Sequence, residues 1–297
     1  MSETLSALRH KIASAGELQG VVRTMRALAA ASIGQYERSV AALADYDRAV
    51  SLGLGECLRQ ARETPAPPEP TSRGDAKWLG AVVFGSDQGL VGRFNELLVE
   101  HVAATLAALP GTPQVWAVGE RIHARLADAG LHVIGHYDVP NSVDAIAPLV
   151  GQIQIDAEAH RARLDYTRHY VFHNLPLAGS LYESVGQRML PLDTSWQQTM
   201  AGVAWPRSAL PEVFGSGAST LRALVREYLF ISLFRACAES LASENASRLA
   251  AMERADRNIR DLLDTMNGRF QRLRQGAIDE ELFDVTAGYE ALKNTLD

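Results

Sequence analysis

The sequence predicts a protein of mixed α and β class (α+β) in which two long terminal helices form an antiparallel coiled coil and an α/β domain is inserted between them. Both ends of the chain lack proline over long stretches, and both carry apolar residues at seven-residue spacing. The middle of the chain instead alternates short Val-rich or aromatic runs with helical patterns. A seven-residue apolar repeat makes paired helices wrap into a left-handed supercoil.

At the N-terminal end we expect one helix from Ser2 to about Gln60. Apolar residues occupy eight unbroken rungs at seven-residue spacing, and others follow the rungs by three or four positions, as a coiled-coil seam requires. The rungs are Leu8, Ala15, Val22, Ala29, Tyr36, Leu43, Val50 and Cys57, with Ile12, Leu18, Met25, Ile33, Val40 and Leu54 between them. Such a helix would be about 90 Å long, and a helix of this length needs a partner.

The expected partner is a helix from Ser219 to about Glu290. Its apolar stripe consists of Met252, Ile259, Met266 and Leu273, extended upstream by Leu224, Tyr228, Ile231, Leu241 and Leu249. Ala and Ser are frequent beside the stripe, and small side chains let two helix axes approach closely. If the two helices are flush at the domain end, the longer last helix projects some 20 Å beyond its partner. A single projecting helix must bury its apolar residues in another protein.

Between the two helices the sequence predicts an α/β domain with a mainly parallel, Rossmann-like sheet. Four prolines between positions 65 and 70 end the first helix, because proline lacks the backbone donor and clashes with the preceding turn. The expected strands are Trp78–Gly85, Gln114–Gly119, Leu131–Tyr137 and Arg168–His173, and the expected helices are Asn95–Leu109, Glu120–Ala129 and Val143–Leu164. Strands alternating with helices predict βαβ connections. We therefore expect three segments: a coiled-coil helix at 1–62, the α/β domain at 76–205 and a second coiled-coil helix at 217–297.

Composition argues against several classes of function. The formal net charge is −6, so the chain lacks the basic footprint that a nucleic acid attracts. It has no run of roughly 18 uncharged apolar residues, as a membrane-spanning helix needs, and its charged N-terminal residues do not resemble a signal peptide. Cys57 and Cys237 are the only cysteines, which fits a reducing compartment and excludes a cysteine metal cluster.

No motif in the sequence predicts an active site, a metal or a cofactor. The segment 84–92 follows a strand and opens a helix, so it could cradle a phosphate. It lacks the Gly-Lys-Ser/Thr of a P-loop and the glycine spacing of a dinucleotide site, which favours a structural turn. His169 and His173 lie two strand pleats apart, but no third ligand with metal spacing accompanies them.

Arginines gather at two places on the terminal helices. Arg23 and Arg26 flank Met25, and Arg269, Arg272 and Arg274 cluster near the end of the last helix. Exposed helical charges usually form a solvated face and contribute little stability, about 0 to 1 kcal/mol. The alternative is that these arginines contact an acidic partner, and the residue pattern leaves the two interpretations nearly even.

At these residues the chain resembles the gamma subunit of F-type ATP synthases, the central rotor stalk. Three segments carry the resemblance: the basic, Ala-rich stretch 21–31, the segment 86–92 followed by Asn95, and the stretch from Leu241 to Gly288. The matching signature residues are Arg23 and Met25, then Asp87, Gly89, Leu90, Gly92 and Asn95, and finally Glu244, Met252, Asn258 and Gly288. The segments follow in order and cover both ends and the middle of the chain.

The resemblance implies a coiled coil that turns inside a ring of three alpha and three beta subunits and couples a membrane ring to ATP synthesis or hydrolysis. It implies partners (alpha, beta and epsilon subunits and the membrane c-ring) and a peripheral position on the cytoplasmic face of the cell membrane. Residues implied to contact a beta subunit are Arg23, Met25, Arg26 and Arg248, together with Arg274, Gln275, Asp279 and Glu281 in a polar catch. The foot that faces epsilon and the membrane ring would be the segment from Glu212 to Phe214, and its implied contact residues are Glu212 and Phe214.

Some residues depart from the family pattern. Gln88 and Val91 replace a usual Arg and Cys, Asp279 replaces a usual Thr, and Arg257 replaces a usual Asp beside Asn258. These changes suggest a divergent copy from an accessory ATPase. We expect a subunit with no chemistry, cofactor or nucleotide binding of its own. The alternatives are a soluble α/β nucleotide-binding enzyme that dimerises through helical arms, and a cytosolic coiled-coil scaffold.

Overall fold

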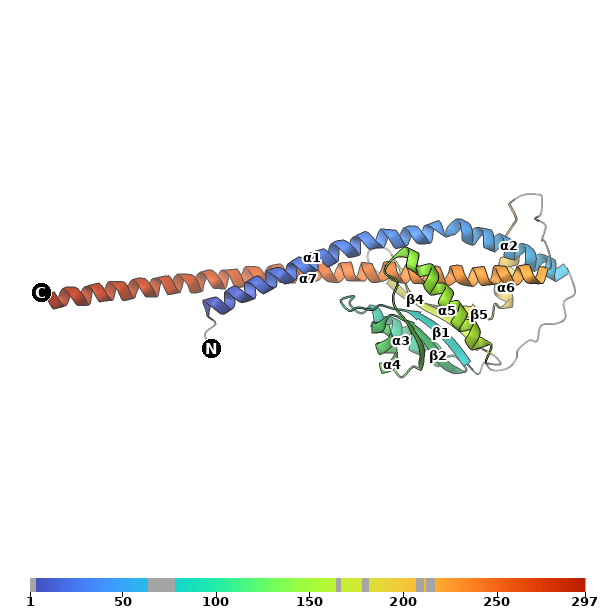
Figure 1. Ribbon diagram of the computed structural model, residues 1–297, viewed down its shortest axis with the longest axis horizontal. Helices are drawn as coiled ribbons and strands as arrows, with labels where there is room; N and C mark the ends of the chain where they lie inside the picture. Colours follow the sequence, from blue (N-terminus) through green and yellow to red (C-terminus); the bar gives the residue numbers. More distant parts are fainter. Residues whose placement is uncertain are drawn as a thin grey trace. The chain divides into compact units, whose positions relative to one another are not determined.

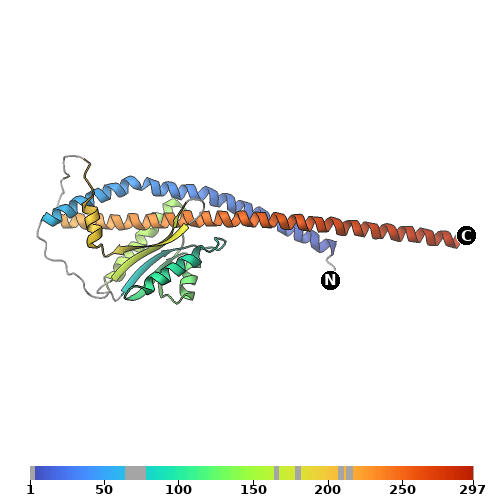
Figure 2. The same cartoon turned by 180° about the vertical axis from the view of Figure 1, so that it is seen from behind.

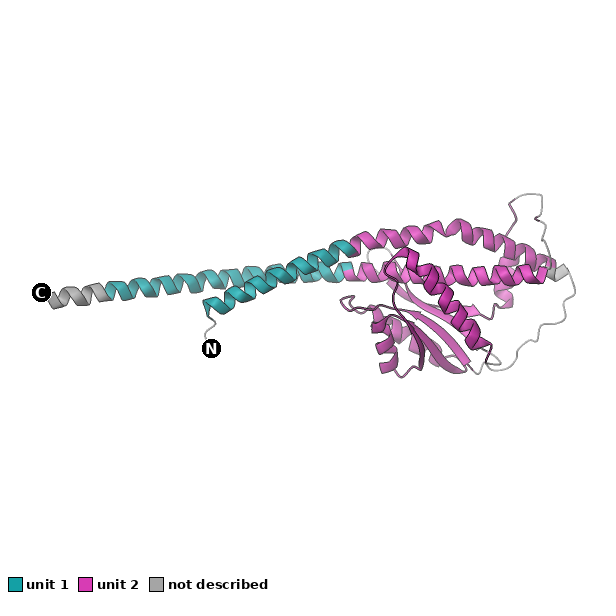
Figure 3. Cartoon of the chain, in the orientation of Figure 1, with its two compact units in different colours: residues 1–28, 249–297 teal, residues 29–248 magenta. Residues whose placement is uncertain are grey.

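The computed structural model describes residues 4–63, 78–163, 167–177, 182–206, 211 and 217–296. The chain forms two compact units, one of residues 1–28 with 249–297 and the other of residues 29–248 (Figure 3). Helix α1 (Leu5–Ala42) and helix α7 (Gly217–Leu296) each contribute to both units. No helix within the described ranges is long and apolar enough to span a membrane.

In the unit of residues 1–28 and 249–297, α1 and α7 lie side by side and run antiparallel (Figure 1). Val22 on α1 packs against Met252 and Ile259 on α7. Nearer the N-terminus, the guanidinium of Arg9 lies 5.9 Å from the ring centroid of Phe270. Contacts therefore move toward the C-terminus of α7 as they move toward the N-terminus of α1. The predicted pairing of the two chain ends is confirmed.

The end of α7 in this unit is bare. Every residue from Gln271 to Ala287 is exposed, and Phe283 is 74% exposed. Leu273, predicted to lie in the seam, is 42% exposed, so that expectation was wrong. The exposed stretch from Gln271 to Ala287 extends about 26 Å, somewhat longer than the predicted projection of some 20 Å.

In the unit of residues 29–248, the N-terminal half of the pair is broken into two helices. Helix α1 ends at Ala42 and helix α2 (Ala44–Glu63) begins after Leu43, where the sequence predicted one continuous helix. Pairing with α7 continues antiparallel through Asp47, whose carboxylate lies 2.6 Å from Arg235, and through Leu54, which packs with Ile231.

The predicted apolar ladder agrees with burial over the length of α1 and α2. Ala15 and Leu43 are half-buried, and the other six rungs are buried. Leu18 was wrongly placed in the seam: it is 54% exposed, and the neighbouring Gln19 is buried instead. Gln19 takes the inner position because its amide has a polar partner across the seam.

The inserted domain has a five-stranded sheet in the order β3-β2-β1-β4-β5. The strands are β1 (Trp78–Phe84), β2 (Thr112–Val118), β3 (Val133–Tyr137), β4 (Thr167–Pro176) and β5 (Tyr182–Leu190). The β1–β2, β1–β4 and β2–β3 pairs are parallel, and β5 is antiparallel to β4. The mainly parallel sheet is confirmed, whereas β5 and the short helix α6 (Thr194–Ala201) were not predicted.

Helices cover both faces of the sheet (Figures 1 and 2). On one face, Leu79, Ala81 and Val83 of β1 pack under α3 (Phe94–Ala107) and α4 (Glu120–Asp128). On the other face, Val82 and Phe84 pack under α5 (Ile146–Arg161) and α7, and the short 3₁₀ helix η1 (Val143–Ala145) leads into α5. This alternation makes α7 part of the domain core as well as part of the helix pair.

The compact units do not coincide with the predicted segments 1–62, 76–205 and 217–297, because α1 and α7 each contribute to both units. Those segment boundaries therefore remain a prediction.

A sharp turn between β2 and α4 requires glycine. Gly119 has a φ of 117°, and a Cβ there would lie 2.7 Å from the backbone carbonyl carbon and oxygen of Ser86. Both the left-handed backbone and the lack of space exclude a side chain.

We expect Gly119→Ala to lower the free energy of unfolding by about 1–3 kcal/mol, because the new Cβ strains the turn against backbone atoms that cannot retreat. Gly89→Ala is the matched control, since no atom lies within 4 Å of a Cβ at Gly89. Urea unfolding of the two variants measures the difference. Equal stability of both variants would contradict the described turn.

Candidate functional site

A buried carboxylate lies between α1 and α7 in the unit of residues 1–28 and 249–297. Oδ1 of Asp256 accepts hydrogen bonds from Nε2 of Gln19 at 3.1 Å and Nε of Arg23 at 3.3 Å. Oδ2 accepts from Nη1 of Arg26 at 3.4 Å and Nη2 of Arg260 at 2.7 Å. The Asp256 side chain is 3% exposed. We call these five residues the Asp256 cluster.

The Asp256 cluster keeps its carboxylate ionised. Burial alone would raise the pKa of Asp256, but the hydrogen bonds from Arg260, Gln19 and Arg23 and the charge of Arg260 outweigh it and hold the pKa below its usual value. Three guanidinium groups around one carboxylate leave a local excess of positive charge. Arg23 and Arg26, two of the predicted contact residues, thus both bind the carboxylate of Asp256.

Beside the cluster, α1 carries an exposed apolar stripe. Leu18, Val21 and Leu28 are each more than half exposed, and their spacing of three and seven residues places them along one side of the helix. Met25, a predicted contact residue, is half-buried against the Val22, Met252 and Ile259 cluster, which leaves its predicted partner contact untested. This surface combines apolar and positively charged groups.

Arg248 lies in the other compact unit, paired with Glu244. Its Nη2 donates a hydrogen bond of 2.5 Å to Oε1 of Glu244, and the two side chains are 15% and 6% exposed. Burial raises the pKa of Glu244, while Arg248 opposes that shift. Both residues line a polar hollow that Tyr36, Asp87 and Gln88 also border, and Nε of Arg248 is buried there with no hydrogen-bond partner among the described residues.

The residues predicted to form a polar catch lie on the bare end of α7. Arg274, Gln275, Asp279 and Glu281 are all exposed. Asn258 is also exposed, whereas Met252 is buried in the seam. Gly288 belongs to the last turns of α7. The predicted foot residues Glu212 and Phe214 lie outside the described residues.

The signature segment 86–92 is a structural turn. Asp87 accepts hydrogen bonds from the backbone amide of Glu120 at 3.0 Å and from that of Val139 at 3.1 Å. The amide of Glu120 belongs to the first turn of α4, where an external anion would otherwise bind. The chain's own carboxylate occupies that position, which favours the structural interpretation over a phosphate site.

The other signature residues of this turn hold its shape. The side-chain amide of Asn95 accepts from the backbone amide of Ser86 and donates to Oγ of Ser86 at 2.8 Å. Leu90 and Gly92 both have positive φ, 64° and 61°. Gly89 and Leu90 are exposed at the outside of the turn.

Two serines attach α7 to the sheet, and a third attaches it to the turn 86–92. Ser240 and Ser243 donate hydrogen bonds of 2.8 Å to the backbone carbonyls of Phe84 and Asn174, and Ser247 donates to that of Val91. All three serines are buried. The sequence pattern marks these serines only as small residues, so their role as donors was not predicted.

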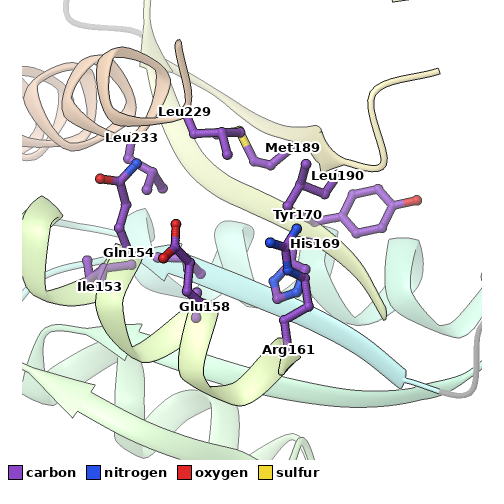
Figure 4. A pocket seen from close by; sticks show the side chains of 12 residues that line it. Ile153, Gln154, Glu158, Arg161, His169, Tyr170, Met189, Leu190, Leu229 and Leu233 are labelled. Atoms are coloured by element: carbon purple, nitrogen blue, oxygen red, sulfur yellow. The ribbon is translucent and has the colours of Figure 1, made fainter. Parts of the chain in front are cut away.

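The two strand histidines, His169 and His173, lie among the chain's own side chains. His169 borders an apolar pocket between α5, β4, β5 and α7, with Glu158 and Arg161 at its edge (Figure 4). Burial, with smaller effects of Arg161 and His160, lowers the pKa of His169 to about 4. His173 lies 2.8 Å from a carboxylate oxygen of Glu239 on α7. No group of three or more metal-binding side chains occurs among the described residues.

Sequence reasoning missed Gln19, Asp256 and Arg260. The spacing of Gln19, Arg23 and Arg26 places them on one helix face and is visible in the sequence. Asp256 could also be noticed in the sequence, because it is a charged residue four positions after Met252 and three before Ile259. That spacing places it among the apolar residues of the seam. Its partner from α1 lies 237 residues away in the chain, so only pairing of the helices reveals the cluster.

Asp87→Ala is expected to lower the free energy of unfolding by about 1–2 kcal/mol, because two backbone amides lose their acceptor. Gln88→Ala, at an exposed neighbour, should have little effect. Thermal unfolding measures the stability of both variants. Titration with ATP should show no binding to the wild-type chain or to either variant. Unchanged stability in Asp87→Ala, or ATP binding that this variant abolishes, would contradict the structural interpretation.

Comparisons with known proteins cover nearly the whole chain. The ATP synthase family model matches residues 4–292. The ATP synthase gamma chain of Moorella thermoacetica is 26% identical over 293 residues, covering 96% of this chain and 98% of that protein. The ATP synthase gamma chain of Salinibacter ruber is 27% identical over 305 residues, covering 97% and 98%.

Solved structures share the fold at lower identity. In the Euglena gracilis mitochondrial ATP synthase (OSCP/F1/c-ring, rotational state 3), one chain matches with a TM-score of 0.62 and 15% identity, covering 97% of this chain and 94% of that one. In the central stalk/c-ring structure of the Tetrahymena thermophila enzyme, the TM-score is 0.54 at 19% identity, covering 79% and 99%. On the family match and the full-length relatives, the chain belongs to the ATP synthase gamma chain family.

Proposed function

We propose that this chain is the central rotor-stalk (gamma) subunit of an ion-translocating F-type ATP synthase. The observation that carries the proposal is a family match from residue 4 to residue 292, together with an antiparallel helix pair whose longer member ends in an exposed apolar tip. In this role the chain transmits rotation between the membrane ring and the catalytic alpha and beta subunits.

The proposed mechanism requires a shaft that differs from side to side. The Asp256 cluster and the stripe of Leu18, Val21 and Leu28 give the shaft charged and apolar surfaces. An asymmetric shaft contacts each catalytic subunit differently at each angle, and differential contact shifts each subunit between its conformational states. Ion flow supplies about 2.3 kcal/mol per charge per 100 mV, so the work of several ions must pass through one stiff element.

The proposed partners follow from the same assignment. Arg23, Met25, Arg26 and Arg248 would lie near the acidic loop of a beta subunit, and Arg274, Gln275, Asp279 and Glu281 would contact the subunits around the tip. Glu212 and Phe214 would face the epsilon subunit and the c-ring. The complex would sit peripherally on the cytoplasmic face of the cell membrane.

In this proposal the chain carries out no chemistry of its own. Support comes from the signature turn, where the backbone amide of Glu120 already donates a hydrogen bond to Asp87. A bound phosphate would need that amide. The rival proposal of a nucleotide-binding enzyme requires that the purified chain bind or hydrolyse ATP alone. The rival of a cytosolic scaffold requires that it function without alpha and beta subunits.

Co-expression with alpha and beta subunits tests the proposed function. We expect the full chain to co-purify with them as one complex that hydrolyses ATP, and the chain alone to show no turnover. The measurement is ATP hydrolysis by the gel-filtered complex and by the isolated chain. Turnover by the isolated chain, or its elution apart from alpha and beta, would overturn the assignment.

The bare tip of α7 provides a second test. Phe283 is 74% exposed, so Phe283→Ser should leave the stability of the isolated chain unchanged. If assembly buries this ring, the lost transfer free energy of about 1.5–3 kcal/mol should weaken association roughly tenfold to a hundredfold. Deletion of residues 286–297 should weaken assembly likewise and leave the α/β domain folded.

The control for the tip is Asp284→Asn, which changes an exposed neighbour without removing apolar surface. Affinity of the complex, measured by titrating labelled chain into alpha–beta hexamer, should separate the two substitutions. Equal affinity of the Phe283 variant, the deletion and the control would show that the tip is not held by the hexamer.

A further inference from the structure

The Asp256 carboxylate has all its acceptor positions filled. A carboxylate offers about four lone-pair sites, and Asp256 receives two hydrogen bonds on each oxygen. Three donors come from α1 and one from α7, with Arg260 also donating through Nε to the backbone carbonyl of Asp256. No position remains on Asp256 for an external donor, so Asp256 itself is not a contact residue.

The cluster hides its anion and presents its cations. Asp256 is 3% exposed at its side chain, whereas the side chains of Arg23, Arg26 and Arg260 are 53%, 40% and 54% exposed. Arg23 donates to Asp256 through Nε, so its hydrogen bond to this carboxylate does not use its two terminal nitrogens. A guanidinium held in this way can still form a bidentate pair with another carboxylate.

We propose that Asp256 is a positioning residue, which holds Arg23, Arg26 and Arg260 as a preformed site for an acidic segment of the surrounding subunits. Free arginine side chains lose rotamer entropy when they bind, and a group already fixed in its bound geometry avoids that loss. The inference rests on the proposed function, because the acidic segment belongs to a partner in the assembled complex.

A charge count and the positioning role predict opposite effects. One carboxylate against three guanidinium groups gives the cluster a net charge of about +2. Asp256→Asn raises this to about +3, so attraction for an acidic segment would rise if only net charge mattered. If Asp256 positions the arginines, the same change weakens binding, because the weaker amide acceptor releases them.

The test measures the affinity of the full-length chain for the alpha–beta hexamer, at low and high ionic strength. We expect Asp256→Asn to bind about threefold to tenfold more weakly at low ionic strength, a loss of the size of one ordinary hydrogen bond, and to lose part of its salt dependence. Asp256→Glu, which keeps the charge, should recover part of the affinity. Tighter or unchanged binding by Asp256→Asn would overturn the inference.

Two controls separate positioning from charge and from stability. Asp261→Asn makes the same change of charge at an exposed residue of α7, and we expect equal or slightly tighter binding. Gln19→Met removes an uncharged donor to the same carboxylate and reports on loosening of the helix pair, measured by thermal unfolding. If Gln19→Met and Asp256→Asn lose the same free energy of unfolding and also the same affinity for the hexamer, Asp256 has only a structural role and the inference fails.

The binding measurements distinguish failure of the proposed function from failure of the positioning role. If the wild-type chain does not bind the hexamer, the proposed function and the inference are both wrong. If the wild-type chain binds and Asp256→Asn behaves like Asp261→Asn, the function stands and the positioning role is wrong.

Discussion

The structure depends on the apolar seam that joins the two ends of the chain. In the unit of residues 1–28 and 249–297 the described residues belong almost entirely to α1 and α7, and long single helices are marginal in water. Val22, Met252 and Ile259 give each helix its partner. Small residues such as Ala238 and Ala242 continue the close contact in the other compact unit, where α7 also enters the domain core. Helix α7 therefore contributes to the helix pair, to the core of the inserted domain and to the exposed C-terminal end.

Charged groups within the seam set its register. Apolar side chains tolerate sliding by a heptad, but Asp256 finds Gln19 and Arg23 in only one alignment of the helices. Asp47 and Arg235 impose the same direction in the other unit. Buried polar pairs contribute little net stability, and their best-attested benefit is such registry. A fixed register also gives the shaft different surfaces on its different sides.

The sequence predicted what short-range periodicity determines. The helix pair, the first four strands and the helices between them follow from spacings of seven, two and 3.6 residues. The break at Leu43 was missed because no proline or glycine marks it. Strand β5 was missed because it is an edge strand with polar and glycine residues, so its alternation is weak.

Features set by distant residues were not predictable in the same way. Asp256 is separated from Gln19 by 237 residues, and its burial follows only from the register of the pair. The predicted contact residues Arg274, Gln275, Asp279 and Glu281 are exposed, so contacts among the described residues do not test their role. Their assignment comes from the family resemblance, because a single sequence contains no trace of the partner's surface.

Hydrogen exchange along α7, before and after assembly with alpha and beta subunits, tests the central claim most directly. The paired residues 249–270 should be protected in the isolated chain, and residues 271–287 should exchange rapidly, since an unpaired helix opens at little cost in free energy. Assembly should then slow exchange across 271–287. Rapid exchange in 249–270 of the isolated chain, or an unchanged rate in the tip of the assembled complex, would contradict a paired rod gripped at its bare end.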